Sequence, residues 1–132
     1  LAHVDESGTQ ISGDRASKTL RLHQHIYAAE PTATCVIHTH ASHLVQLSIQ
    51  GVWSAQDIVP PITPYFVMKV GHVPQIPYAV PGALTVAAQV AAAIQRSQRD
   101  EKPIRAVLLE RLGPVVWHAS LSQASAVLEE LE

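Results

Sequence analysis

One histidine-rich stretch, Val36-Ile-His-Thr-His-Ala-Ser-His43, constrains what this chain can fold into more than any other. Its first half is apolar and β-branched, which favours a buried strand. Because strand side chains alternate between two faces, His38 and His40 share one face with Val36, and the intervening residues share the other. Two imidazoles placed in this way can converge on a single cation. A helix should follow directly, so His43 would lie where the strand passes into that helix.

Helical and strand patterns alternate along the rest of the chain. The segment 64–69 fits either a short strand or one helical turn, and the proline-rich segment 53–63 predicts a loop. This alternation, with closely spaced strands near the C-terminal end, predicts an α/β layered domain around one mixed or antiparallel sheet. The expected elements are a hairpin at 1–14, helices at 17–30, 41–50, 82–99 and 120–132, and strands at 34–40, 70–78, 104–109 and 114–117.

Composition excludes several classes of function. The 132 residues suit one domain, and 47% of them are hydrophobic, which is enough for a core. The net charge of −2, without a basic run, argues against a nucleic-acid surface. No apolar run approaches the roughly 20 residues of a membrane span. Cys35 is the only cysteine, so an internal disulfide is excluded and a reducing cytoplasm is favoured.

Some side chains allow two readings from the residues alone. His23 lies in the apolar stripe of the predicted helix 17–30, where it could be a hydrogen-bonded core histidine or part of a site. Ser17 and Lys18 begin that helix, either as an N-cap with a solvated lysine or as an anion-binding pair. Tyr65 is either a pocket residue or a packing residue. Trp53 and Trp117 are expected to be packing residues.

The histidine stretch and its flanking segments resemble the class II aldolase/adducin family, whose members include fuculose-phosphate aldolase, ribulose-phosphate 4-epimerase and a decarboxylase branch. The resemblance runs from about residue 9 to the end of the chain. The segments 60–71 and 73–78 are similar to the branch that decarboxylates 3-oxo-tetronate 4-phosphates. Three further segments carry the resemblance, Ser17–Tyr27 before the histidine stretch, Leu108–Val116 as the late strand and turn, and Leu121–Glu132 as the closing helix.

The resemblance implies a fold, a site and an assembly. The implied fold is a three-layer α-β-α domain with a mixed, mostly antiparallel sheet, and the implied assembly is a homotetramer with sites at subunit interfaces. His38 and His40 would be ligands of Zn²⁺ or another divalent metal, with His43 as an outer neighbour that does not bind the metal directly. Ser17, Lys18 and Tyr65 would contact a small phosphorylated sugar-type substrate.

Three departures from the family pattern bear on activity. Thr19 stands where the family carries its catalytic acidic residue, and Leu112 stands where it carries the third metal-ligating histidine. The family's early phosphate-binding loop has no counterpart within residues 1–132, nor does its segment after the closing helix. Two imidazoles should hold zinc much more weakly than three, so we expect the metal to be weakly bound or absent.

These features leave three hypotheses for function, the third of which is a plain metal-binding protein without turnover. The first is a metal-dependent lyase that cleaves or decarboxylates a small phosphorylated sugar acid or ketose, with impaired turnover. The second is a catalytically silent family member that serves as a structural or oligomer-forming module. The intact His38-x-His40-x-x-His43 pattern favours the first, and Thr19 and Leu112 favour the second.

Overall fold

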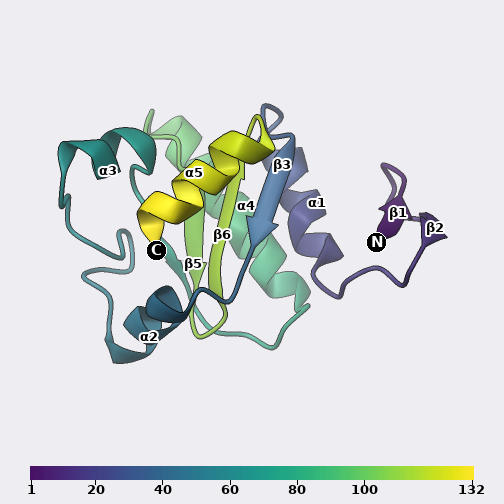
Figure 1. Cartoon of the computed structure of the whole chain (residues 1–132), viewed down its shortest axis with the longest axis horizontal. Helices are drawn as coiled ribbons and strands as arrows, with labels where there is room; N and C mark the ends of the chain where they lie inside the picture. Colours follow the sequence, from purple (N-terminus) through teal and green to yellow (C-terminus); the bar gives the residue numbers. More distant parts are fainter.

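A four-stranded sheet with helices on both faces forms the body of the protein (Figure 1). The computed structural model describes all 132 residues. The sheet order is β3-β6-β5-β4, in which β3 pairs antiparallel with β6, β6 antiparallel with β5, and β5 parallel with β4. The strands are β3 (Cys35–His38), β4 (Gln75–Ile76), β5 (Ala106–Leu109) and β6 (Gly113–His118). The expected three-layer fold with a mixed, mostly antiparallel sheet is confirmed.

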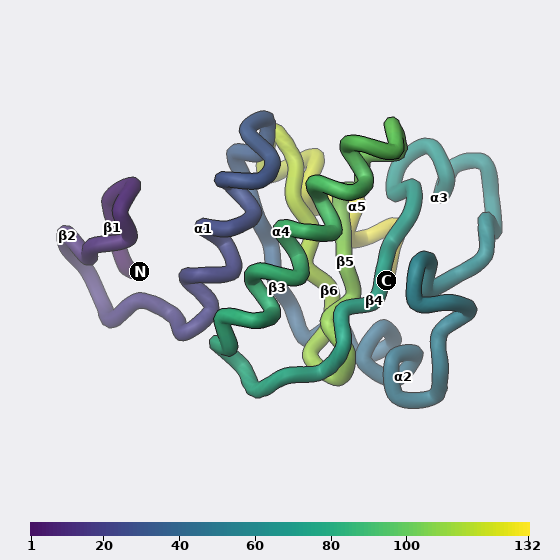
Figure 2. The backbone as a smooth tube through the Cα atoms, turned by 180° about the vertical axis from the view of Figure 1, so that it is seen from behind, coloured from purple at the N-terminus to yellow at the C-terminus, as the bar shows by residue number.

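Two separate cores lie on the two faces of this sheet. Helices α1 (Leu20–Ala29) and α4 (Leu84–Arg99) cover one face (Figure 2). Their apolar stripes bury Ile26 and Val90 in one core with Trp117. Helices α2 (Ser42–Gln50), α3 (Pro64–Lys69) and α5 (Leu121–Leu131) cover the other face. Side chains alternate between the two faces along β6, so Val115 and Trp117 lie in the first core and Val116 lies in the second.

The same alternation orients the histidine stretch. Val36 packs against the core under α1 and α4, whereas Cys35 and Ile37 pack against the opposite core. His38 follows Val36 by two residues, so its side chain leaves the strand on the α1 and α4 face. The predicted sharing of faces is therefore confirmed for Val36 and His38. The strand is shorter than the predicted 34–40, and His40 lies beyond its end.

One segment settles an open prediction, and another differs from its prediction. The ambiguous segment 64–69 is helix α3, which begins with Pro64 and is capped by Thr63, whose hydroxyl accepts the N–H of Phe66 at 3.0 Å. The expected strand 70–78 is reduced to the two residues of β4. Pro74 and Pro77 flank those two residues and have no N–H to donate, so the ladder cannot extend.

The N-terminal hairpin stands apart from the body (Figure 1). It consists of β1 (Ala2–Val4) and β2 (Gln10–Gly13), which pair antiparallel with each other and with no other strand. Its turn approaches α1 at the side chain of Gln24, where a Cβ on Gly8 would collide. The predicted hairpin is confirmed. No helix in the structure is both long and apolar enough to cross a membrane.

Candidate functional site

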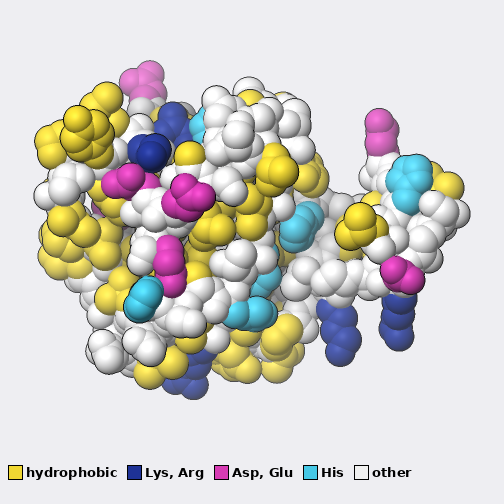
Figure 3. Space-filling model, viewed as in Figure 1, with side chains coloured by type: hydrophobic (Ala, Val, Ile, Leu, Met, Phe, Trp, Pro, Cys, Tyr) yellow, Lys and Arg dark blue, Asp and Glu magenta, His cyan; other side chains and the backbone are white.

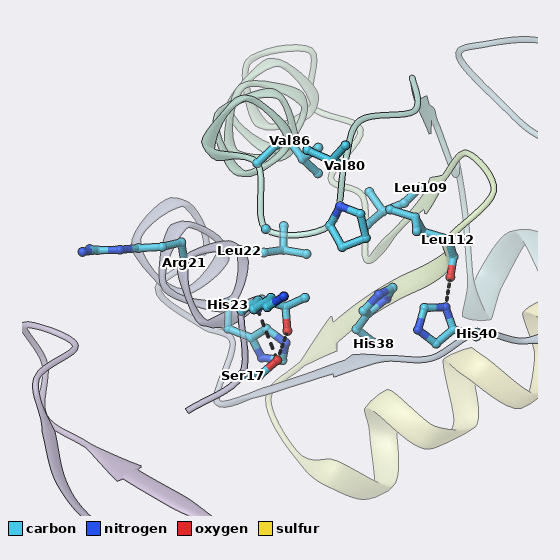
Figure 4. Close-up of a pocket in the computed structure, with 15 residues that line it drawn as sticks. Ser17, Arg21, Leu22, His23, His38, His40, Val80, Val86, Leu109 and Leu112 are labelled. Carbon is cyan, nitrogen blue, oxygen red and sulfur yellow. Dashed lines mark hydrogen bonds between the residues drawn. The ribbon is translucent and has the colours of Figure 1, made fainter. Parts of the chain in front are cut away.

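Backbone carbonyls hold both imidazoles of the His-x-His pair in place. His38 Nδ1 lies 2.9 Å from the carbonyl oxygen of Pro114. His40 Nδ1 lies 2.6 Å from that of Leu112, as the dashed line in Figure 4 marks. A carbonyl can only accept, so each neutral ring carries its hydrogen on Nδ1 and leaves Nε2 with a free lone pair. The two ring centroids are 5.3 Å apart, with an interplanar angle of 64°. Such carbonyl partners are typical of histidines that bind metals through Nε2.

Gly113 makes these two contacts sterically accessible. The turn between β5 and β6 presses against the end of β3, and a Cβ at Gly113 would collide with the carbonyl oxygen of Thr39. Its φ of +111° lies in the region that glycine tolerates and other residues rarely adopt. A glycine at this position therefore lets the carbonyls on either side of it reach the two imidazoles.

A cavity of about 430 Å³ opens beside the imidazole pair. One wall is the start of α1 with Ser17, Lys18 and Thr19, and another is the segment 80–83 before α4. The Thr19 hydroxyl is engaged, because its Oγ1 lies 2.8 Å from Ser17 Oγ. No aspartate or glutamate lines the cavity, so Lys18 and the neighbouring Arg21 leave its local charge positive. Arg21 itself extends away from the imidazoles (Figure 4).

His23 is a third imidazole on the cavity wall. The ring is half-buried on α1, and burial, followed by the nearby His38, lowers the pKa of His23 below its ordinary value. The sequence left open whether His23 is a core residue or a site residue, and the structure places it at the cavity. His23 lies four residues after Thr19, a spacing that places two residues on the same side of a helix. This spacing could have predicted His23 as a site residue.

Desolvation also governs His38. Burial lowers the pKa of His38, the hydrogen bond to Pro114 opposes this shift, and the charge of His40 adds to it. His38 is therefore held in its neutral form, the form in which an imidazole nitrogen can bind a cation or accept a proton.

Several other candidate residues lie elsewhere. His43 Nδ1 lies 3.0 Å from Glu132 Oε1 at the start of α2 and does not line the cavity. Tyr65 lies on α3 and is 77% exposed, away from the cavity of its own chain. His72 pairs with Asp57 at 2.7 Å, and His118 accepts the N–H of Ala119 at the opposite end of β6. None of the four joins the imidazole pair.

The donor set does not fit a catalytic zinc ion, which needs about three protein ligands. No group of three histidine, cysteine, aspartate or glutamate side chains is placed to hold a metal. Leu112 points an alkyl side chain at the cavity, while its carbonyl is used by His40. Thr19 offers a hydroxyl already bonded to Ser17. No third ligand, His23 included, is placed together with the two imidazoles to hold a metal.

Comparison with known proteins decides the family. The family model for the class II aldolase and adducin N-terminal domain matches residues 1–132. The chain belongs to the class II aldolase and adducin family. Among curated members of this family, the 3-oxo-tetronate 4-phosphate decarboxylase of Cupriavidus necator is 52% identical over the whole chain. The enzyme of the same name from Escherichia coli K12 is 37% identical over 133 residues.

Solved structures of the family agree with the fold. YgbL from Escherichia coli superposes with a TM-score of 0.85 at 35% identity, covering 97% of this chain and 58% of that one. The L-fuculose-1-phosphate aldolase of Thermus thermophilus gives a TM-score of 0.69 at 22% identity, a likeness of fold. The chain spans 58% of the length of the Cupriavidus enzyme and 59% of the length of the Escherichia coli enzyme.

Proposed function

We propose that this chain carries the site of a lyase acting on a small phosphorylated sugar acid or ketose, and that its turnover is impaired. The observation that carries the proposal is the imidazole pair His38 and His40, held by carbonyls at the wall of a cavity that contains no carboxylate. The names of its decarboxylase relatives support the substrate class.

Substrate binding is assigned to the start of α1. Ser17 and Lys18 line the cavity beside helix N–H groups that have no side-chain cap. The N–H groups of Leu20 and Leu22 already donate to the carbonyls of Ser17 and Thr19. The positive end of the helix dipole and a lysine together favour a phosphate group. Tyr65 would contact substrate only in the cavity of a neighbouring subunit, because its own cavity is out of reach.

Impairment is argued from Thr19 and Leu112. Thr19 occupies the position of the family's acidic residue and cannot act as a carboxylate base, and Leu112 cannot ligate a cation through its side chain. Zn²⁺ or another divalent metal should accordingly be bound weakly or not at all. Aldol cleavage needs a positioned acid or base, whereas decarboxylation of a 3-oxo acid leaves an enolate that water can protonate. Residual decarboxylation is therefore favoured over aldol cleavage.

Metal affinity and turnover test this proposal separately. The chain should purify with far less than one zinc per molecule. The double variant Thr19→Glu with Leu112→His should bind zinc at least about 100-fold more tightly than the unaltered chain, because changes to ligands and to their neighbours alter metal affinity by factors of this size. Titration calorimetry measures the affinity. The single variant Leu112→Ala is the control, because it removes the leucine without adding a ligand.

Either of two results would count against the proposal. Stoichiometric zinc in the unaltered chain would show that its present donors suffice, and impairment through lost ligands would be wrong. Failure of the double variant to gain affinity would remove His38 and His40 from the metal site. Release of CO2 from 3-oxo-tetronate 4-phosphate is then followed with both proteins, and a rate no faster than in buffer from the double variant would sink the assignment as a lyase.

A silent, oligomer-forming module is the second candidate, and the surface around α3 favours it. Large apolar side chains are exposed there and gather at one end of the molecule (Figure 3). A surface of this kind fits contact with further copies of the chain, and the family resemblance suggests a tetramer. The exposed side chains are Trp53 at 61%, Ile62 at 62%, Tyr65 at 77% and Met68 at 76%.

Light scattering after gel filtration tests this second candidate. The chain should form an oligomer that Met68→Glu dissociates, whereas Gln46→Glu, on exposed α2 surface, should leave it intact. A monomer at all concentrations would contradict it.

We also propose that residues 1–132 act as a single domain and, from the lone Cys35, that this domain works in a reducing cytoplasm.

A further inference from the structure

Ser48 is a buried polar residue, with 7% of its surface exposed. It lies on α2, and its hydroxyl donates to the carbonyl of Val45 at 2.7 Å, one turn earlier in the same helix. The same oxygen accepts the backbone N–H of Arg111 at 2.9 Å. The hydroxyl hydrogen is used within the helix, so the second bond ties α2 to the turn between β5 and β6.

That turn has a backbone conformation that needs support. Arg111 has a φ of +62°, in the left-handed region that side chains disfavour, and Gly113 follows with a φ of +111°. The turn is seated between Ser48 on one side and the end of β3 on the other, where Gly113 lies against the carbonyl of Thr39. Loss of the Ser48 acceptor would leave the Arg111 N–H without its partner at this seat.

The residue after Arg111 supplies the contact that orients a site imidazole. Leu112 O accepts the hydrogen of His40 Nδ1 at 2.6 Å, whereas His38 is held by Pro114 O, within the paired strand β6. The N–H that Ser48 holds and the carbonyl that holds His40 therefore belong to adjacent residues. The carbonyl that holds His38 is anchored independently by strand pairing.

We propose that Ser48 is a positioning residue for the site, which fixes the turn through the Arg111 N–H and thereby sets the orientation and tautomer of His40. The inference rests on the proposed role of His40 in the site. The test of this inference measures the position of a hydrogen on an imidazole ring and not turnover. The role of Ser48 and the proposed lyase activity can therefore be disproved independently.

Imidazole ¹⁵N chemical shifts of the full chain test this role. They are recorded about two pH units above the ordinary imidazole pKa of about 6.5, where neutral rings dominate. Signals are assigned by comparison with His38→Gln and His40→Gln. In the unaltered chain both rings should carry their hydrogen on Nδ1. In Ser48→Ala, His40 should lose this single tautomer and become a mixture with Nε2–H, while His38 keeps its Nδ1–H form.

The chain offers a closely matched control in Ser97. Its hydroxyl donates to the carbonyl of Ile94 at 2.8 Å, three residues back in α4, and accepts the N–H of Ile104 at 3.3 Å. Ser97→Ala thus deletes the same pair of bonds on the opposite face of the sheet. It should leave the tautomers of both His38 and His40 unchanged.

An unchanged His40 tautomer in folded Ser48→Ala overturns the proposal, and so does an equal change at both histidines or in the Ser97→Ala control. If Ser48→Ala does not fold, Ser48→Cys serves in its place, because a thiol of similar shape is a much weaker acceptor. The expected and contradicting results are the same for that variant.

Discussion

At the scale of single residues, the three imidazoles of the cavity differ in what restrains them. His38 and His40 each have Nδ1 bound to a carbonyl, whereas no hydrogen bond restrains His23. The pKa values of His23 and His38 are both lowered, chiefly by burial. The folded protein therefore resists the protonation that its unfolded chain accepts freely.

The lowered pKa values of His23 and His38 predict that acid destabilises the fold. A histidine whose folded pKa is depressed stabilises the fold fully above its unfolded pKa, about 6.5, and that stabilisation is lost as the pH falls toward the folded pKa. The unfolding free energy should therefore decline below about pH 6.5, and His23→Gln should decline less steeply.

Urea denaturation at a series of pH values provides the measurement. The difference between the two proteins at about pH 8, where imidazoles are neutral, gives the packing cost of the substitution and serves as the control. Parallel curves for the two proteins down to about pH 5 would contradict the burial argument for His23.

At the scale of elements, the turn between β5 and β6 is where strand, helix and site meet. The Leu112 carbonyl in this turn holds His40, Ser48 of α2 holds the Arg111 N–H, and Gly113 provides the close approach to β3. Glu110 Oε2 also accepts the N–H of Tyr78 at 3.0 Å, which links this turn to the segment forming another wall of the cavity.

Gly113→Ala should destabilise the protein by about 2–4 kcal/mol, because it adds a collision with Thr39 to the cost of a positive φ. Gly51→Ala is the matched control. Gly51 has a comparable φ of +122° but open space around its Cβ, so it should show the backbone cost alone, about 1 kcal/mol. Thermal and urea unfolding measure both, and equal losses would show that the contact with Thr39 is not limiting.

Sequence patterns anticipated much of this architecture but not its long-range pairings. Helical periodicity placed α1, α4 and α5, and alternation placed His38 on the face of Val36. His40 lies beyond β3 but lines the same cavity as His38. The length of β4 depends on prolines at both of its ends, and the exposure of Trp53, expected to pack, depends on which surfaces α3 leaves open. The pairing of His43 with Glu132 joins residues 89 apart, a distance over which no local pattern carries information.

At the scale of the whole molecule, the body and the hairpin should differ in stability. Strands β5 and β6 are buried between two cores, whereas β1 and β2 pair only with each other and are largely exposed. An isolated two-stranded hairpin is marginally stable in water. Opening of the hairpin should therefore occur without unfolding of the body.

Hydrogen exchange followed by mass spectrometry should resolve this difference. Paired amides of β1 and β2 should exchange on the order of 10³-fold faster than those of β6, which open only with global unfolding. A truncation that starts at Asp14 should leave the exchange rates of β6 unchanged. Protection of the hairpin equal to that of β6 would show that it is part of the cooperative body.

The acceptors of both site imidazoles are main-chain carbonyls, those of Leu112 and Pro114. Every amino acid supplies such a carbonyl, so a substitution at Leu112 can change the side chain that faces the cavity without removing the acceptor that orients His40. The side chains at these positions can therefore change while the main-chain acceptors of the two imidazoles stay in place. After a single substitution such as Leu112→His, the main-chain carbonyl at this position would still orient His40.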